Sequence, residues 1–205
     1  MIRAIKLKKI VFFVIIFLIF LIIFHYKNNL FGNNIIKNRN KIEEKILNSF
    51  ENYSAEMEIT VNSNKTSNSY EIYQEVSDNQ SKQEVKKGEN IEGLKIELNQ
   101  NNLKISNTKL NLEKVYENYT NLLNNSLFLN TFSNDYRNEE NTTNYSEEND
   151  EIIMEVKLNK NQNTYISSKI LHVNHDTLKP TKLEVKDNTN KETICIIYNS
   201  IELNK

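Results

Sequence analysis

The stretch that decides the fold is residues 53–61, "YSAEMEITV", in which apolar and polar side chains alternate. Its apolar positions are Tyr53, Ala55, Met57, Ile59 and Val61. Successive side chains of a β-strand point to opposite faces of the sheet, so this period of two predicts a strand with one buried face. A sheet of such strands needs a cover for its apolar face.

More strand-like segments lie on the C-terminal side of this stretch, although the buried face of residues 164–173 is ambiguous. They are residues 69–76, 83–88, 94–98, 103–105, 110–116, 151–158, 164–173, 181–187 and 192–203. Their spacing is typical of an antiparallel meander. The sole proline, Pro180, stands directly before one of them, where a missing N–H costs least.

Two segments have helical spacing instead and can supply the cover. Residues 35–50 carry the apolar positions Ile35, Ile42, Ile46 and Phe50. Residues 119–136 carry Tyr119, Leu122, Leu123, Leu129, Phe132 and Tyr136. The order is helix, strands, helix, strands, which predicts an α+β domain with a curved antiparallel sheet covering the helices. Residues 137–150, "RNEENTTNYSEEND", are acidic and almost without apolar content, so we expect a mobile loop there.

The N-terminal region predicts a transmembrane helix. Basic residues precede fifteen consecutive apolar residues, which include the anchor positions Ile10, Phe13, Phe17, Phe20 and Phe24. No small-residue cleavage site follows them, so we predict a retained signal-anchor, with a cleaved signal peptide as the alternative.

The chain is therefore predicted to have three parts. Residues 1–27 form a cytoplasmic basic tip and the membrane helix, residues 28–34 a linker, and residues 35–205 the folded domain. Because the positive charges precede the apolar run, a single pass through the cell membrane would leave the C-terminal domain extracytoplasmic.

Composition excludes several classes of function. With Gly32, Gly88 and Gly93 as the only glycines, neither a phosphate-binding loop nor a nucleophile elbow can be built. The single cysteine, Cys195, excludes an intrachain disulfide and a thiolate metal cluster. Five of the 26 basic residues lie in the first 27 positions, which hold no acid, so the remainder carries about −6 and shows no basic stripe for nucleic acid. We therefore expect a protein that is not an enzyme and has no cofactor.

Two histidines and the cysteine could have a chemical role, but we expect each of them to be structural. His172 and His175 could share a metal, but they straddle a strand end and its turn, so we interpret them as turn or surface histidines and expect no metal site. We expect Cys195 to be a buried, inert thiol. The aromatic and apolar residues around the expected helices could line a cavity or pack the core, and packing is favoured for the tyrosines. The candidate cavity lining is Phe50, Tyr53, Met57, Tyr70, Leu129 and Phe132.

Three longer stretches resemble a known family. Residues 53–74, "YSAEMEITVNSNKTSNSYEIYQ", residues 103–121, "LKISNTKLNLEKVYENYTN", and residues 176–203, "DTLKPTKLEVKDNTNKETICIIYNSIEL", are similar to GerS and GerS-related sporulation and germination proteins of spore-forming Firmicutes. The resemblance covers roughly residues 43–204 and rests on the order of strands and turns. It implies a fold similar to the lipoprotein carrier LolA, a half-open β-barrel with helices in its mouth.

The resemblance also carries expectations about function. It implies a non-enzymatic lipoprotein of the spore envelope, outside the mother-cell or forespore membrane, that binds and regulates a cortex-modifying amidase. This sequence lacks the lipobox cysteine, so the Ile10–Phe24 helix would make the membrane link. The alternative is a LolA-like carrier or binder of lipid acyl chains in the concave cavity. Whether the protein forms a homo-oligomer is left open.

Overall fold

The computed structural model describes residues 41–77, 80–99, 102–119, 127–159 and 166–203. The chain forms two compact units, Met1–Lys45 and Ile46–Lys205. Residues 41–48 are helical, and everything else below concerns the second unit. Within the described ranges, no helix has both the length and the apolar character to cross a membrane. The predicted anchor, linker and first helical turns lie outside them.

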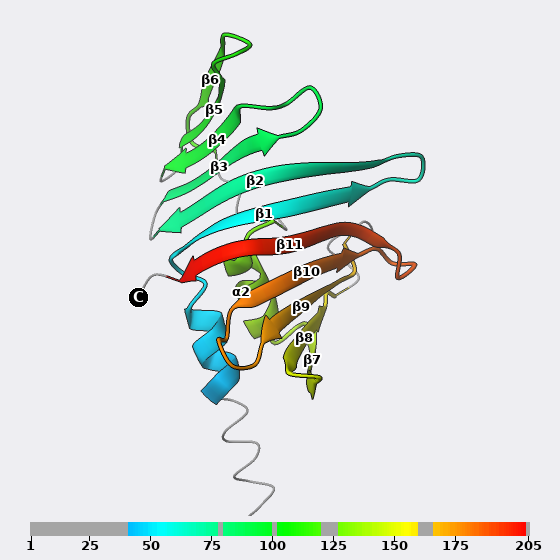
Figure 1. Cartoon of the computed structure of the whole chain (residues 1–205). Helices are drawn as coiled ribbons and strands as arrows, with labels where there is room; N and C mark the ends of the chain where they lie inside the picture. Colours follow the sequence, from blue (N-terminus) through cyan, green and yellow to red (C-terminus); the bar gives the residue numbers. More distant parts are fainter. Residues whose placement is uncertain (1–40, 78–79, 100–101, 120–126, 160–165, 204–205) are drawn as a thin grey trace, which may run out of the picture. The chain divides into compact units, whose positions relative to one another are not determined.

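The strands of the second unit form one antiparallel sheet (Figure 1). Before the helix α2 (Leu129–Arg137) come β1 (Tyr53–Asn62), β2 (Ser67–Ser77), β3 (Gln80–Lys87), β4 (Leu94–Asn99), β5 (Asn102–Asn107) and β6 (Leu112–Tyr116). After it come β7 (Thr142–Glu148), β8 (Glu151–Lys157), β9 (Ser168–Asn174), β10 (Pro180–Lys186) and β11 (Glu192–Leu203). The spatial order is β6-β5-β4-β3-β2-β1-β11-β10-β9-β8-β7, so two meanders meet where the first strand pairs with the last.

The alternation in β1 sets the register of its neighbours. Ala55 lies opposite Gln74 of β2 and Ile201 of β11, and Ile59 lies opposite Tyr70 and Ile196. Residues opposite one another point to the same face, so the buried face of β1 continues into both meanders. The strand predicted from residues 53–61 is confirmed, and Tyr53, Ala55, Met57 and Ile59 are buried, whereas Val61 near the end of the strand is exposed.

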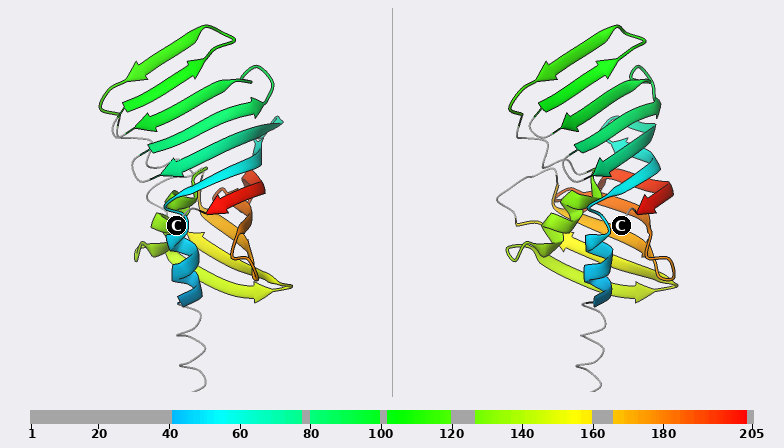
Figure 2. Two further views of the ribbon diagram at one scale, coloured as in Figure 1. Left: turned by 60° about the vertical axis from the view of Figure 1, so that its left-hand side comes forward. Right: turned by 90° about the vertical axis from the view of Figure 1, so that its left-hand side faces the viewer.

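Two helical segments cover this face, as the sequence predicts. The sheet curves around α2, which lies on its concave side (Figure 2). The Ser133 hydroxyl in α2 donates to the Leu47 carbonyl at 3.1 Å, which joins the two helical segments. The expected curved antiparallel sheet over helices is thus present in the described residues.

The second helix differs from the expected range. Residues 117–118 form a turn, and the helical backbone in the described residues begins at Leu129 and ends at Arg137. The residues from 120 to 126 lie outside the description. Among the described residues, the apolar spacing that predicts a helix over 119–136 is matched from Leu129 to Tyr136.

The mobile loop expected at residues 137–150 is wrong for half of its length, because it contains β7. Thr142–Glu148 pairs in register with β8, from Thr142 opposite Lys157 to Glu148 opposite Glu151. The sequence does not indicate this strand because its composition is polar. An edge strand needs little apolar content when a buried neighbouring strand supplies its backbone hydrogen-bond partners. A tight turn joins the two strands, since Asn149 and Asp150 both have positive φ, as a type I′ hairpin requires.

Candidate functional site

The strand at one edge of the sheet exposes an apolar cluster. In the described part of the chain, four of the six exposed large apolar side chains lie on β6 or in the turn before it. They are Leu110, Leu112, Val115 and Tyr116, with exposed fractions of 64, 46, 51 and 43%. Every residue of β6 is exposed. These four side chains, together with the side of β6 that does not pair with β5, are called the β6 edge below.

The register of β6 places its side chains on defined faces. Leu103, which is buried, lies opposite Tyr116, and Ile105 lies opposite Lys114. Tyr116, Lys114 and Leu112 therefore point to the concave face, and Glu113 and Val115 to the convex one. Among the described residues β6 pairs with β5 alone, so its other side presents unpaired backbone N–H and C=O groups.

Charges on β6 are held close to the strand. Glu113 Oε2 lies 3.1 Å from Lys104 Nζ of β5, and the Glu113 side chain is still 63% exposed. Lys114 Nζ lies 5.6 Å from the centroid of the Tyr116 ring. One acidic and one basic group therefore stand next to each other in the strand, on opposite faces.

A buried asparagine positions the β5–β6 turn. The Asn107 side-chain amide donates to the Glu92 carbonyl at 3.0 Å, and its oxygen accepts from the Leu110 N–H at 3.2 Å. Asn111 completes the turn with φ of 49°, a conformation that asparagine tolerates better than most residues. These bonds fix where β6 begins.

The opposite edge of the sheet is built differently. β7 ends in Glu147 and Glu148, and none of its residues is an exposed large apolar one. Charged and polar side chains on an edge strand discourage pairing with other chains. Because the β7 edge is polar and the β6 edge is apolar, the β6 edge is the candidate site.

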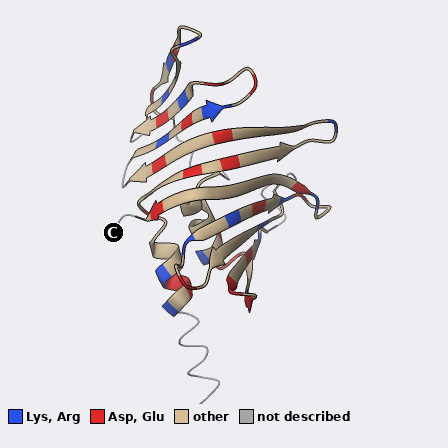
Figure 3. Ribbon diagram, in the orientation of Figure 1, with Lys and Arg blue, Asp and Glu red and all other residues tan. Residues whose placement is uncertain are grey.

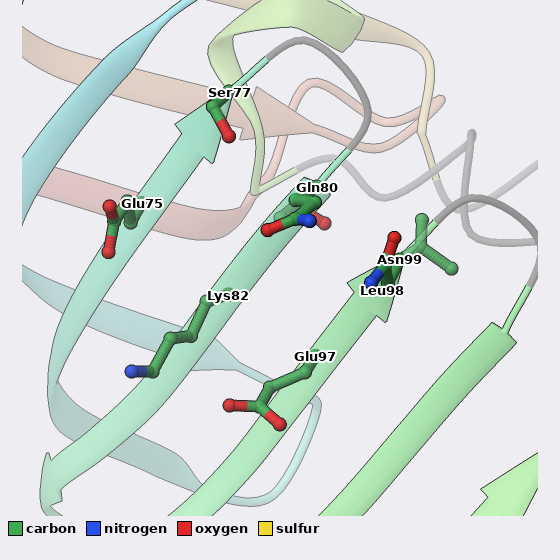
Figure 4. A pocket seen from close by; sticks show the side chains of 8 residues that line it. Glu75, Ser77, Gln80, Lys82, Glu97, Leu98 and Asn99 are labelled. Atoms are coloured by element: carbon green, nitrogen blue, oxygen red, sulfur yellow. The ribbon is translucent and has the colours of Figure 1, made fainter.

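A pocket of about 390 Å³ lies at the ends of β2, β3 and β4 (Figure 4). Its lining is Glu75, Ser77, Gln80, Ser81, Lys82, Glu97, Leu98 and Asn99. Glu75, Lys82 and Glu97 lie opposite one another in register, so positive and negative charges alternate across the strands. Figure 3 shows the same mixture of signs along the sheet, without a basic stripe in that view. The lining therefore indicates no particular ligand.

Polar groups inside the core attach α2 to the sheet. The Tyr53 hydroxyl donates to Gln74 Oε1 at 2.5 Å and accepts from the Leu129 N–H at 3.2 Å. Burial raises the pKa of the Tyr53 phenol far above its ordinary value, so it stays neutral. At the other end of the helix, Lys169 Nζ of β9 lies 2.6 Å from Asp135 Oδ2.

The residues predicted to line a cavity are found in or beside the packed core. Phe50, Tyr53, Met57, Leu129 and Phe132 are buried, and Tyr70 is half-buried. None of the six lines the pocket at the ends of β2, β3 and β4. Their role as a cavity lining stays a prediction.

The histidines are engaged with carboxylates. His172 Nδ1 lies 3.1 Å from Glu151 Oε2, and its Nε2 lies 3.6 Å from Glu184 Oε1. His175 stands beside Asp176 in the turn after β9. Within the ranges described, no group of three or more His, Cys, Asp or Glu side chains is arranged to hold a metal ion.

The expected burial of Cys195 is wrong, because the side chain is half-exposed. The apolar run around it hides the alternation: Ile196 and Tyr198 face the core, and Cys195 and Ile197 face outward. Partial burial, followed by the Glu192 carboxylate, raises the pKa of its thiol. The thiol form is therefore favoured at neutral pH.

Comparisons with known proteins give the class of the fold. No protein-family model matches the sequence, and no curated protein does. Solved structures match it. An uncharacterized conserved protein from Thermus thermophilus has a TM-score of 0.51 at 7% identity, over 82% of this chain and 88% of that one. A LolA superfamily protein from Nitrosomonas europaea has a TM-score of 0.39 at 11% identity, over 79% and 93%.

A member of the family that the sequence resembles is also among the structural matches. GerS of Clostridioides difficile, solved in complex with the CwlD amidase, is 24% identical over 84% of this chain and 95% of that one, with a TM-score of 0.49. GerS and a LolA superfamily protein, the two kinds of protein named by the resemblance over residues 43–204, are both among the solved structures to which this chain is similar.

Proposed function

We propose that this protein is a non-enzymatic, membrane-anchored binding protein whose extracytoplasmic domain docks another protein at the β6 edge. The observation that carries the proposal is the set of exposed apolar side chains on both faces of β6 and in the turn before it, Leu110, Leu112, Val115 and Tyr116, on a strand that pairs on one side only among the described residues. Proteins usually blunt such edges with charge, as β7 does here, because a free apolar strand recruits other chains. An edge kept apolar is suited to binding.

The partner that the sequence resemblance suggests is a cortex-modifying amidase of the spore envelope. Regulation by docking needs no chemistry in this chain. It needs a higher affinity for one state of the partner than for the other, which shifts the partner's population toward the favoured state. The place of action in this proposal is the space between the forespore and mother-cell membranes.

A pull-down from sporulating cells tests the proposal. The full-length tagged chain is cross-linked in the cells, solubilised and captured, and an unrelated tagged single-pass protein is the control. We expect a wall hydrolase or another envelope protein to be enriched over the control. If no envelope protein is enriched, the docking function is wrong.

The membrane anchor gives a separate prediction. Phe17→Lys places a charge near the centre of the predicted span and should cost about 2.5–3.5 kcal/mol of insertion free energy. We expect the protein to leave the membrane fraction or to be mislocalised, as measured by fractionation of cells. Phe17→Leu is the matched control and should fractionate normally. An unchanged distribution of the lysine variant would contradict the anchor.

A second function, binding of acyl chains, is favoured by one observation. On the concave face of β4 and β5, Leu94, Ile96 and Ile105 are only half-buried, in contrast to the fully buried Leu171 and Leu183 of β9 and β10. Apolar surface of this kind could contact a lipid tail. Mass spectrometry of lipids extracted from the purified full-length chain separates the two functions, since only a carrier retains a stoichiometric lipid.

A further inference from the structure

We propose that the β6 edge accepts an extended strand of a different protein, with an acidic residue opposite Lys114 and a basic residue opposite Glu113. This inference rests on the proposed docking function and specifies the chemistry of its partner. The added strand would continue the sheet beyond β6 through main-chain hydrogen bonds, and its side chains would supply the specificity.

The register of β6 defines what each position of an incoming strand meets. Residues directly opposite one another share a face, so partners of Leu112, Lys114 and Tyr116 lie on the concave face. Partners of Glu113 and Val115 lie on the convex face. Apolar side chains fit opposite Leu112, Val115 and Tyr116, whose exposed surfaces they would cover.

A second copy of this chain does not satisfy these positions. Two β6 strands that pair antiparallel and keep their concave faces on one side must be centred on a residue that lies opposite itself. Centring on Lys114, which aligns the whole strand, sets Lys114 against Lys114. Moving the centre to Glu113 sets two Glu113 side chains opposite each other, and moving it to Val115 sets Glu113 against Glu117. Like charges directly opposite destabilise a strand pair, so charge disfavours each register in which three or more β6 residues pair with β6 of a second copy, and a different partner is favoured.

Both charged side chains are free enough to take part. Glu113 is 63% exposed although Lys104 lies 3.1 Å away, so a second cation can approach it from the open side. Lys114 is exposed and lies over the Tyr116 ring at 5.6 Å from the centroid. A carboxylate on the added strand would reach this ammonium group on the concave face, and cross-strand pairs of opposite charge stabilise an antiparallel pair.

Two synthetic peptides test the inference against the full-length chain in detergent micelles. The first, Thr-Val-Val-Glu-Lys-Val-Thr, runs antiparallel to β6 and sets its glutamate against Lys114 and its lysine against Glu113. The second, Thr-Val-Val-Lys-Glu-Val-Thr, has the same composition with the two charges exchanged. Fluorescence anisotropy of the labelled peptides should show about tenfold tighter binding of the first, since two cross-strand pairs change from attractive to repulsive.

A charge exchange in the protein is the matched variant. The double substitution Glu113→Lys with Lys114→Glu keeps the composition of an exposed strand and should reverse the preference by about tenfold. Equal binding of both peptides, or an unchanged preference in the double variant, would overturn the inference. So would a dimer in light scattering of the wild type that Val115→Pro abolishes, because the occupant would then be a second copy.

The pull-down distinguishes this inference from the function on which it rests. If the wild type enriches an envelope protein and the double variant enriches it less, both stand. If the double variant enriches it equally well, the partner docks elsewhere, so the strand-addition inference fails and the docking function stands. If the wild type enriches none, the docking function fails whatever the peptides show.

Discussion

Replacing Phe132 with alanine should lower the free energy of unfolding by about 3–5 kcal/mol. Phe132 is fully buried in α2, and its ring stacks on Tyr136 with a centroid distance of 5.7 Å. Removing the ring leaves a cavity between the helix and the sheet, which the surrounding backbone can fill only in part. The loss is a large fraction of the 5–15 kcal/mol that typically holds a domain together. Urea unfolding of the full chain in detergent, followed by circular dichroism, measures it.

The same helix provides the control. Asn134 is exposed two positions further along α2, and alanine is the best helix former, so Asn134→Ala should change the free energy of unfolding by less than about 0.5 kcal/mol. Equal stabilities of the two variants would show that the helix does not pack on the sheet as described.

Removing the carboxylate of Asp135 should cost about 3 kcal/mol. The Lys169 side chain is 4% exposed, and Asp135, 29% exposed, is its ion-pair partner in the structure. Asp135→Ala leaves a buried ammonium group without its counter-charge, which is far more costly than losing a surface pair. The estimate is at the low end of the range for buried pairs because water reaches the carboxylate. Urea unfolding is again the measurement.

Two further variants test the cause of this loss. Lys157→Met breaks the exposed pair between Lys157 and Glu155, which are 3.6 Å apart, and should cost about 0–1 kcal/mol. Combining Asp135→Leu with Lys169→Met replaces the buried pair with apolar groups and should recover most of the loss. A double variant as unstable as Asp135→Ala would contradict an electrostatic origin.

The sequence predicts the strands well because period two is a strong local signal. Residues 53–61 and 192–203 correspond to β1 and β11 almost residue for residue. The pairing of β1 with β11 is not predictable in the same way, since it joins residues at opposite ends of the domain and leaves no local pattern. The helices are recognised by apolar spacing, but the start of α2 at Leu129 is not, because Phe128 at its N-cap makes no side-chain hydrogen bond.

The candidate site is the part that the sequence does not predict. Leu112 and Val115 lie on opposite faces of β6, and nothing in the local sequence indicates that β6 pairs with β5 alone among the described residues. The same holds for Lys169, whose position between Ser168 and Ile170 does not indicate that Asp135 pairs with it in the core. The polar residues 142–148 are mistaken for a loop for the opposite reason: their strand structure comes from β8 and not from their own composition.

The central pairing of β1 with β11 has a consequence for how the chain is made. Tyr53 lies opposite Leu203, so β11 must be synthesised before the two meanders can join. Until then β1 and β10 each lack one neighbouring strand, so the newly made chain has two more unpaired strand edges than the folded sheet. Contacts this distant in sequence form slowly. β11 therefore joins the two halves of the sheet. A polypeptide truncated shortly before Glu192 would have two unjoined meanders, whose unpaired strands proteases could cleave or other nascent chains could bind.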